Sequence, residues 1–473
     1  MDLSLVNSID FKGYAIMSEI FDGRFSETEY MTTLNAKLAS QYPAHIAQLQ
    51  QMTKSVLSRE NLEGLVIHSG QEIKAFLDDN CYPFKVNPHF KYWLPLIDIP
   101  NSWLVVNGED KPTLIYYQPV DFWHKVTPLA ESYWGEFFTI KILTNASEVD
   151  QLLPYDKKGF AYIGSHIEVA TALGFDAINP EPLLNYIHYH RGYKSKYEHE
   201  CLRQSNTLAV KAHQAARNAF LQGDSEYDIQ QAYLKSIGYG TNDTPYGNIV
   251  ALNKNCSILH YMSLDKTTPQ VHQSFLIDAG ANFNGYSADI TRTYSYKNDK
   301  FAELIARMDK LMLNAVAGLK PGLSYVDLHI ETHRAIGQVL RDFNFITVDA
   351  DTAVESGIIS TFFPHGLGHH LGLQVHDVGG FMADERGTHV NTPAEHPFLR
   401  TSRMIEANQV FTIEPGLYFI DSLLADLKAS ANGDQVNWQN VDEMRCFGGI
   451  RIEDNIIVHQ SHNENMTRDL GLS

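Results

Sequence analysis

The chain has 473 residues, and 37 lysines and arginines stand against 56 aspartates and glutamates, which gives a formal net charge of −19. The length predicts two or three domains, and the 44% of apolar residues is typical of a folded globular protein. This negative charge repels phosphate backbones, and no uncharged apolar run approaches the roughly 18 residues of a membrane span, so neither nucleic acid nor a membrane is an expected partner.

Residues 1–33 carry scattered acids, little periodicity and a second candidate start at Met31. We expect an N-terminal extension that is poorly structured or mis-started. From residue 34 the pattern is firmer, because apolar residues at helical spacing between His45 and Leu57 are followed by short β-rich runs at 65–67, 103–106 and 114–117. Residues 34–192 are therefore predicted to form an N-terminal α/β domain.

The second predicted domain, residues 193–473, begins with a long helix. Ser195 and Glu198 have the spacing of a capping box, and the helix can run to Phe220 with Gly223 just beyond its end. Two further helices are predicted, at about 300–318 and 324–343. All of the dense motifs lie in this domain.

Two β-rich runs flank Asn284-Gly285, a pair that predicts a hairpin turn. If the turn centres between residues 283 and 284, Asp278 lies directly opposite Asp289. If it centres on Asn284-Gly285, Asp278 faces position 291, a diagonal neighbour of Asp289. In both registers the carboxylates share one face, with Cβ atoms about 5–8 Å apart, and such like charges are destabilising without a cation between them. A solvated hairpin face is the alternative.

Four histidines lie within twelve residues, and glycines between them argue against a regular helix. The segment is predicted to be a tight loop that leads into a short strand. So many imidazoles favour a metal or acid/base site over core packing, but their spacing leaves open which of them is a ligand. The histidines are His365, His369, His370 and His376.

Two further glutamates occur in strand-like runs. Pro415 pushes Glu414 into extended geometry at the end of a strand. Arg451 and Glu453 alternate with isoleucines, so they are expected to share one face of another strand. Each glutamate alone is weak evidence, because a strand glutamate beside an arginine is usually an ion pair.

Together the motifs supply four carboxylates and at least one imidazole. Ligation rich in oxygen with a single nitrogen suits Mn²⁺ or Co²⁺ better than zinc. Four carboxylates are more than one cation needs, so two ions about 3.5–4 Å apart with bridging carboxylates explain the surplus.

In this order the motifs resemble those of the pita-bread dinuclear metallopeptidases, a family that includes methionine aminopeptidase, aminopeptidase P and prolidase. The resemblance covers about residues 38–470, includes 82–88, 120–125 and 245–250, and is greatest to bacterial Xaa-Pro dipeptidases of the organophosphorus acid anhydrolase type. It implies an α/β (α+β) fold with a small N-terminal α/β domain, used for substrate closure and dimerisation, before a pita-bread catalytic domain.

The resemblance also implies a ligand set for two Mn²⁺ ions, with Co²⁺ able to substitute. The second histidine of His-Gly-x-x-His is the family's ligand, and two of the carboxylates, Asp289 and Glu453, would bridge the ions. The full implied set is Asp278, Asp289, His369, Glu414 and Glu453.

Further roles follow from the same resemblance and its implied mechanism. Glu414 would relay a proton, His376 and His260 would stabilise the oxyanion, and Arg451 would orient Glu453. His365 and Tyr246 would line the substrate pocket, Asp79 would meet the substrate amine, and Trp123 would reach a neighbouring pocket across a dimer interface. Arg400 would meet the substrate carboxylate, with Arg403 as the competing candidate. His370 is expected to pack or to support the site. His188 and His190 have strand spacing and no carboxylate beside them, so they are interpreted as structural.

The sequence therefore predicts a cytoplasmic, homodimeric hydrolase of Xaa-Pro dipeptides, with side activity on organophosphorus esters and fluorides. The cytoplasm is favoured by four scattered cysteines without a Cys-x-x-Cys pair and by an acid at position 2, where a secretory signal carries a basic residue. Two alternatives are an aminopeptidase P-like enzyme acting on longer peptides and a non-catalytic peptide-binding module.

Overall fold

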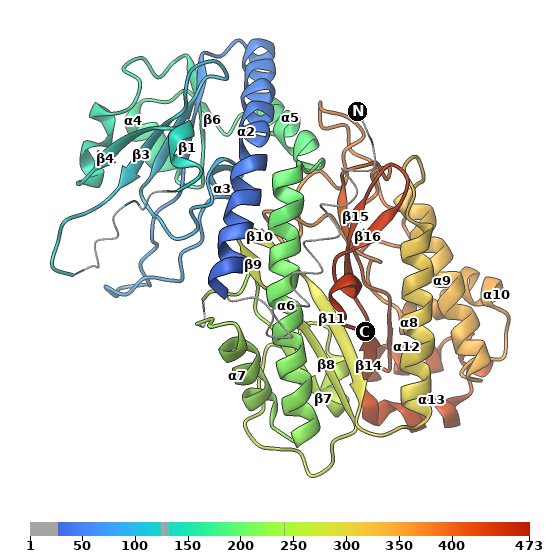
Figure 1. Ribbon diagram of the computed structural model, residues 1–473. Helices are drawn as coiled ribbons and strands as arrows, with labels where there is room; N and C mark the ends of the chain where they lie inside the picture. Colours follow the sequence, from blue (N-terminus) through green and yellow to red (C-terminus); the bar gives the residue numbers. More distant parts are fainter. Residues whose placement is uncertain (1–26, 124–128, 130–131, 241) are drawn as a thin grey trace, which may run out of the picture. The chain divides into compact units, whose positions relative to one another are not determined.

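The computed structural model describes residues 27–123, 129, 132–240 and 242–473 (Figure 1). Most of the predicted N-terminal extension therefore lies outside the described residues. Residues 27–33 begin helix α2 (Glu27–Glu60), so for this stretch the prediction of poor structure is wrong. No glycine or proline lies between Glu27 and the buried Leu38, and the helix extends back through these residues.

The chain divides into two compact units. The N-terminal unit holds the described residues up to 191 together with 195–201 and 384–387, and the C-terminal unit holds 192–194, 202–383 and 388–473. Over the described residues, none of the helices combines the length and the apolar character needed to cross a bilayer.

The N-terminal unit is built on one mixed six-stranded sheet in the order β4-β3-β2-β1-β5-β6. Its three β-rich runs predicted from the sequence form β1, β2 and β3, which pair antiparallel, and β4, β5 and β6 add parallel pairs. The strands are β1 (Gly64–His68), β2 (Trp103–Val106), β3 (Thr113–Tyr117), β4 (Thr139–Leu143), β5 (Phe160–Ile163) and β6 (Ala177–Ile178). The helices besides α2 are α3 (Pro88–Trp93), α4 (Ile167–Leu173) and α5 (Glu181–Arg191).

The long helix predicted after residue 195 is α6 (Lys196–Gln222), and its capping box is confirmed. The backbone N–H of Ser195 donates to Glu198 Oε2 at 2.8 Å, and the N–H of Glu198 donates to Ser195 Oγ at 3.3 Å. Gly223 follows the helix with φ of 87°, as a C′ glycine does. The two later helices are confirmed as α8 (Lys300–Gly318) and α9 (Tyr325–Asp342).

Short strands in several small sheets form the rest of the C-terminal unit. The sheet orders are β11-β8-β7, β12-β15-β16, β13-β14 and β10-β9. The strands are β7 (Ile249–Leu252), β8 (Ser274–Ala279), β9 (Asn282–Phe283), β10 (Tyr286–Ser287), β11 (Ile290–Ser295), β12 (Val410–Ile413), β13 (Gly416–Tyr418), β14 (Gly449–Arg451), β15 (Asp454–Val458) and β16 (Asn463–Asn465). The remaining helices are α7 (Glu226–Ser236), α10 (Ala350–Glu355), α11 (Ile358–Phe362), α12 (Asp421–Ala429) and α13 (Trp438–Met444).

Two hydrophobic cores cover these sheets. In one, α6 and α7 pack on β7 and β8 through side chains such as Phe220 and Tyr233. In the other, α8, α9 and α12 pack with β12–β15 through side chains such as Met308, Leu340 and Ile456. In Figure 1 the green helices α6 and α7 accordingly lie beside β7 and β8, and α8 and α9 lie beside the red strands.

The hairpin that carries the two aspartates adopts the second of the two predicted registers. Ile290 pairs with Ala279 and Thr291 pairs with Asp278, so Asp289 is the diagonal neighbour of Asp278. The turn is centred on Asn284 and Gly285, which have φ of 52° and 90°. Positive φ at both central residues is what a type I′ turn requires, and asparagine and glycine tolerate it best.

The N-terminus of α8 offers a test of local helix stability. Asp299 Oδ1 accepts hydrogen bonds from the backbone N–H groups of Phe301 and Ala302, both at 3.1 Å. We expect Asp299→Ala to lower the free energy of unfolding by about 1 kcal/mol, because both donors lose their acceptor. Asp299→Asn keeps an acceptor oxygen and is the matched control. Equal urea midpoints for the alanine and asparagine variants would contradict this assignment.

Candidate metal centre

The five predicted ligands come from strand ends and one loop of the C-terminal unit. Asp278 lies on β8, and Asp289 directly precedes β11. Glu414 directly follows β12, as its position before a proline predicts, and Glu453 lies between β14 and β15. His369 lies in the glycine-containing loop after α11, where only an isolated bridge between His370 and Phe411 replaces the predicted short strand.

These side chains converge on one point. Ligand atoms of Asp289, His369 and Glu453 all lie within 4.8 Å of one another. His369 Nε2 lies 3.4 Å from Asp289 Oδ2 and 3.7 Å from Glu414 Oε1. The hydroxyl of Tyr246 lies 2.8 Å from Asp278 Oδ1 and 2.5 Å from Asp289 Oδ1, so it joins the remaining aspartate to the group.

Burial and mutual repulsion disfavour so many negative charges at one point. Burial, followed by repulsion from Asp289, raises the pKa of Glu453 well above its usual range. Burial also raises the pKa of Glu414 to about 7. For Asp289 the effect of burial is outweighed by the hydrogen bond and charge of His369, so its pKa is lowered. In the protein without metal, the group is therefore partly protonated near neutral pH.

The donor set fits divalent metal ions. Glu453 is 1% exposed, and its Oε1 has no hydrogen-bond partner among the described residues although the atom is buried. An unsatisfied buried carboxylate oxygen is costly, and a cation would satisfy it. Four carboxylates with a single imidazole form an oxygen-rich set of the kind that holds hard divalent ions. The residues that would hold them are the five already described.

The predicted role of Arg451 needs a correction. Its guanidinium donates to Asp278 Oδ2 at 2.7 Å and to the hydroxyl of Tyr418 at 2.9 Å, so the carboxylate that it orients is Asp278. It reaches Glu453 only through Thr291, which accepts from Arg451 Nε at 3.2 Å and donates to Glu453 Oε2 at 2.7 Å. Both side chains meet at the hydroxyl of Thr291, so the predicted shared face holds although β14 ends at Arg451 and β15 begins at Asp454, and only the direct contact differs from the prediction.

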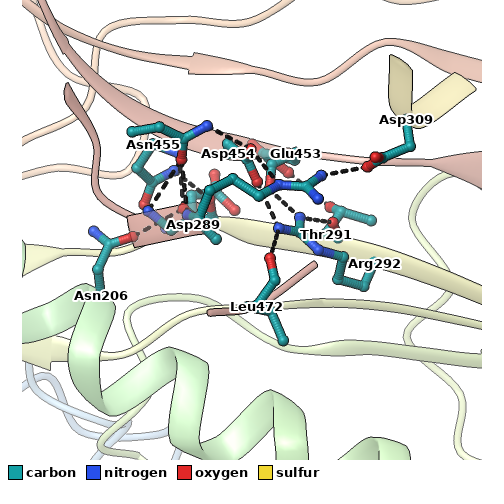
Figure 2. Close-up of polar contacts among 12 residues, drawn as sticks. Asn206, Asp289, Thr291, Arg292, Asp309, Glu453, Asp454, Asn455 and Leu472 are labelled. Atoms are coloured by element: carbon teal, nitrogen blue, oxygen red, sulfur yellow. Dashed lines mark hydrogen bonds and ion pairs between the residues drawn. The ribbon is translucent and has the colours of Figure 1, made fainter. Parts of the chain in front are cut away.

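A buried ion pair next to the centre was not predicted. Figure 2 shows Arg292 and Asp454 in contact beside Asp289 and Glu453, and their closest atoms lie 2.6 Å apart. Arg292 also donates to the carbonyl oxygens of Thr291 and Glu453, both at 2.9 Å. The pair thereby fixes the backbone that carries one metal ligand. The sequence shows Arg292 in the β-rich run just after Asp289, but it does not indicate that the partner of Arg292 is Asp454.

Two of the predicted pocket histidines lie beside the ligands. His365 Nε2 is 2.8 Å from the hydroxyl of Tyr418, and its Nδ1 is 3.8 Å from Glu414 Oε2. The ring of His376 lies 4.4 Å from that of His369 at an angle of 83°. Desolvation lowers the pKa of His365 to about 3 and that of His376 to about 4, so both imidazoles are neutral at pH 7.

The two candidate arginines differ in their surroundings. After desolvation, the charge of Arg400 is among the causes that lower the pKa of both His365 and His376, which places it near the pocket. Arg400 is exposed. Arg403 is 2% exposed, pairs with Glu406 at 3.1 Å and lies 4.8 Å over the ring of Tyr193. These contacts favour Arg400 as the arginine available to a substrate.

The other predicted residues have varied positions. His260 is exposed, and its charge also acts on His376. Asp79 and Trp123 are exposed residues of the N-terminal unit, and their roles stay predictions. Residues 124 and 125 of the motif around Trp123 lie outside the described residues.

Three further histidines were interpreted from the sequence without a role in catalysis. His370 is 1% exposed and packs on Phe411 with ring centroids 4.7 Å apart. His188 and His190 lie on helix α5, so their assumed strand spacing is wrong. In the N-terminal unit, His190 also contacts Glu385 at 3.2 Å, although no carboxylate was expected near it. Glu385 is distant in sequence, so the spacing of nearby residues could not indicate this contact.

Comparison with known proteins identifies relatives of both parts of the chain. Residues 40–189 match the family described as "Xaa-Pro dipeptidase, N-terminal domain", and residues 200–460 match "Metallopeptidase family M24". A curated Xaa-Pro dipeptidase of Colwellia psychrerythraea (strain 34H) is 97% identical over 443 residues, which are 94% of this chain and 100% of that protein. One from Pseudoalteromonas translucida (strain TAC 125) is 60% identical over 92% of this chain and 99% of its own length.

Solved structures with the same fold include aminopeptidase P of Escherichia coli in a low-pH form. It has a TM-score of 0.68 and 24% identity, and the match covers 89% of this chain and 94% of that one. Proline aminopeptidase P II of Yersinia pestis has a TM-score of 0.66 and 22% identity over 91% and 96% of the two chains. The predicted fold class, a small N-terminal α/β domain followed by a pita-bread domain, is confirmed.

The loop that carries His369 depends on the absence of a side chain at Gly368. A Cβ atom there would overlap the carbonyl oxygen of Thr412 and lie 2.6 Å from the hydroxyl of Tyr325. We expect Gly368→Ala to push His369 out of place, to lower bound metal by more than half, and to lower the free energy of unfolding by about 1–3 kcal/mol.

Gly240→Ala is the matched control, because a Cβ atom at Gly240 would meet only Asp243 Oδ2, at 3.4 Å. Elemental analysis after dialysis gives the metal content, and urea denaturation gives the stability. Full metal content in Gly368→Ala would show that the loop accommodates the extra methyl group.

Proposed function

The chain belongs to metallopeptidase family M24, and from this premise we propose that it is a dipeptidase that hydrolyses Xaa-Pro dipeptides at a centre of two metal ions. The observation that carries the proposal is the convergence of four carboxylates and one imidazole on a single buried point. The full-length similarity to proteins named Xaa-Pro dipeptidase supports the choice of substrate.

The chemistry divides between the ions and the side chains. Two divalent ions held by the five ligands would act as Lewis acids and would activate a water molecule for attack at neutral pH. Glu414, whose Oε1 lies 3.7 Å from His369 Nε2 among the ligands, would accept a proton from the attacking water and return it to the leaving proline nitrogen. His376 and His260 would donate hydrogen bonds to the carbonyl oxygen as it gains charge.

Selection of a dipeptide requires groups that recognise both charged ends of the substrate. Arg400 is proposed to bind the proline carboxylate, because its charge lies near His365 and His376 and it is exposed. Asp79 is proposed to meet the amine, and Trp123 to enter the pocket of a second subunit. Recognition of both ends excludes longer peptides, which distinguishes this activity from that of an aminopeptidase P-like enzyme.

Several finer features belong to the same proposal. The oxygen-rich ligand set supports Mn²⁺ as the metal, with Co²⁺ able to substitute. Free thiols at all four cysteines, two of them exposed, support a reducing cytoplasm. The family resemblance supports a homodimer, which light scattering would test. A tetrahedral phosphorus centre is similar to the peptide intermediate, so hydrolysis of organophosphorus esters and fluorides, at their P–O and P–F bonds, is proposed as a side activity.

Metal removal and substrate length together test the activity. We expect protein stripped of metal to lose Leu-Pro hydrolysis and to regain it with Mn²⁺, because water activation needs the ions. We expect Leu-Pro to be cleaved at least about 100-fold faster than a pentapeptide that begins with Leu-Pro, since the longer chain lacks the nearby carboxylate. Faster release of leucine from the pentapeptide would favour the aminopeptidase alternative.

A variant of a bridging ligand tests the site itself. Asp289→Asn keeps the shape of the side chain but removes its charge, so we expect kcat for Leu-Pro to fall by more than about 100-fold with Mn²⁺ present. Near-normal activity would rule out a bridging role for Asp289. Hydrolysis of a dialkyl fluorophosphate by the unaltered protein and by Asp289→Asn tests whether the organophosphorus side activity uses the same metal centre.

The carboxylate contact predicts a difference between the two arginines. We expect Arg400→Met to raise KM for Leu-Pro by about 10–100-fold, the loss expected for a charged hydrogen bond, with little change in the urea midpoint. Arg403→Met removes a buried arginine that pairs with Glu406, so its main effect should be on stability. The reverse pattern in KM would assign the contact to Arg403.

A further inference from the structure

A second group of histidines lies in the C-terminal unit, outside the five ligands and the pocket residues. His329 and His333 are four residues apart on α9, and this spacing places both on one face of the helix. His396 comes from the segment between residues 388 and 408, which contains no helix or strand. Together we call His329, His333 and His396 the histidine triad.

The three rings form a compact triangle. Each pair of ring centroids is 4.5 Å apart, and the interplanar angles lie between 61° and 89°. One ligand nitrogen from each ring can be chosen so that all three nitrogens lie within 4.8 Å of one another. This spacing is close enough for one cation to contact all three rings after a small adjustment.

Two of these nitrogens are buried without a hydrogen bond. His329 is 1% exposed and His333 is 2% exposed. Among the described residues, His329 Nδ1 and His333 Nε2 have no hydrogen-bond partner. A buried polar atom without a partner costs about 1–3 kcal/mol, so two in one cluster need a compensating ligand. Among the described residues, no carboxylate oxygen is grouped with these three rings, although Glu395 next to His396 acts to raise the pKa of that ring.

The charge state of the rings suits metal binding. Burial, followed by the neighbouring histidines, lowers the pKa of His329, and burial with His396 lowers the pKa of His333 to about 3. Burial also lowers the pKa of His396. All three imidazoles are therefore neutral at pH 7, which is the form that coordinates a metal ion.

We propose that the histidine triad binds one Zn²⁺ ion at a site separate from the carboxylate centre. Three imidazole nitrogens with an open fourth position form a ligand set that zinc accepts, whereas Mn²⁺ prefers oxygen ligands. Zn–N bonds of 2.0–2.1 Å imply nitrogens about 3.4 Å apart in a tetrahedral site, and since the nitrogens lie within 4.8 Å of one another, each pair would close by at most about 1.4 Å. His396 is half-buried and lies outside regular structure, which makes it the ring that can move.

The position of the triad connects it to the substrate pocket. Phe363 packs on His333 at 4.9 Å on one side and on the pocket residue His365 at 4.8 Å on the other. His396 also lies four residues before Arg400. A zinc ion in the triad would therefore join α9 to the segment that carries Arg400. Any effect on substrate binding rests on the proposed function, whereas zinc binding itself does not.

The test counts zinc ions per chain in the full-length protein. Samples are stripped of metal, equilibrated with Zn²⁺, dialysed and measured by elemental analysis. We expect about three equivalents in the unaltered protein, about two in His396→Gln and about one in Asp289→Asn/Glu453→Gln. His389→Gln is the matched control, because His389 lies in the same segment outside the triad, and we expect it to keep all three.

Thermal unfolding gives a second measurement, which does not require the Asp289→Asn/Glu453→Gln variant to fold. With the carboxylate centre filled by Mn²⁺, added Zn²⁺ should raise the Tm of the unaltered protein and of His389→Gln but not of His396→Gln. Equal zinc content and equal shifts in His396→Gln and the unaltered protein would overturn the proposal. Failure of Leu-Pro hydrolysis would overturn the proposed function and leave these counts unaffected.

Discussion

The cost of burying four carboxylates at one point is the constraint on which the C-terminal unit depends. Burial raises the pKa values of Asp278, Glu414 and Glu453. Within the protein, the opposing positive charge comes mainly from Arg451, and the hydrogen bond to Asp289 and the charge of Glu414 raise the pKa of His369 despite its burial. One arginine cannot balance four negative charges, and His369 must be neutral to act as a ligand. Divalent ions resolve both problems, because two of them carry a charge that matches the four carboxylates.

The fold meets this constraint by fixing the backbone around the ligands. Arg292 bonds to Asp454 and to the carbonyl oxygens of Thr291, Glu453 and Leu472, so one buried cation joins β11, the start of β15 and the C-terminal segment. Asp454 receives further hydrogen bonds from Asn465 and Arg468, which satisfy its second oxygen. Because this carboxylate is fully paired, it remains ionised and does not compete for metal. The Arg292–Asp454 ion pair therefore positions the backbone of the metal ligand Glu453, but neither of its residues is itself a metal ligand.

The sequence alone predicted those features of the site that depend on residues adjacent in the chain. The Asn284-Gly285 turn restricted Asp278 and Asp289 to one face, and the Glu414-Pro415 step put a carboxylate at a strand end. The choice of His369 among four histidines came from the family resemblance, since spacing did not distinguish them. The partner of Arg451 could not be predicted, because Asp278 lies on β8, far from Arg451 in the sequence. The histidine triad was missed for a similar reason. His329 and His333 show helical spacing, but His396 is more than sixty residues away, and only tertiary packing brings it near.

Two donor sets with opposite metal preferences lie in one folded unit. The carboxylate centre offers mostly oxygen, and its excess negative charge favours hard ions at the cost of a strong pH dependence. The histidine triad offers only neutral nitrogen ligands, so no charge attraction between ligand and ion would add to metal binding. Its affinity would depend on the preference of zinc for imidazole. The ring of Phe363 contacts both His333 of the triad and the pocket residue His365. In a closely packed interior, a shift of His333 would therefore displace Phe363 against His365. Because ligand type rather than distance sets metal preference, the two proposed sites would favour different metals even though they lie close together.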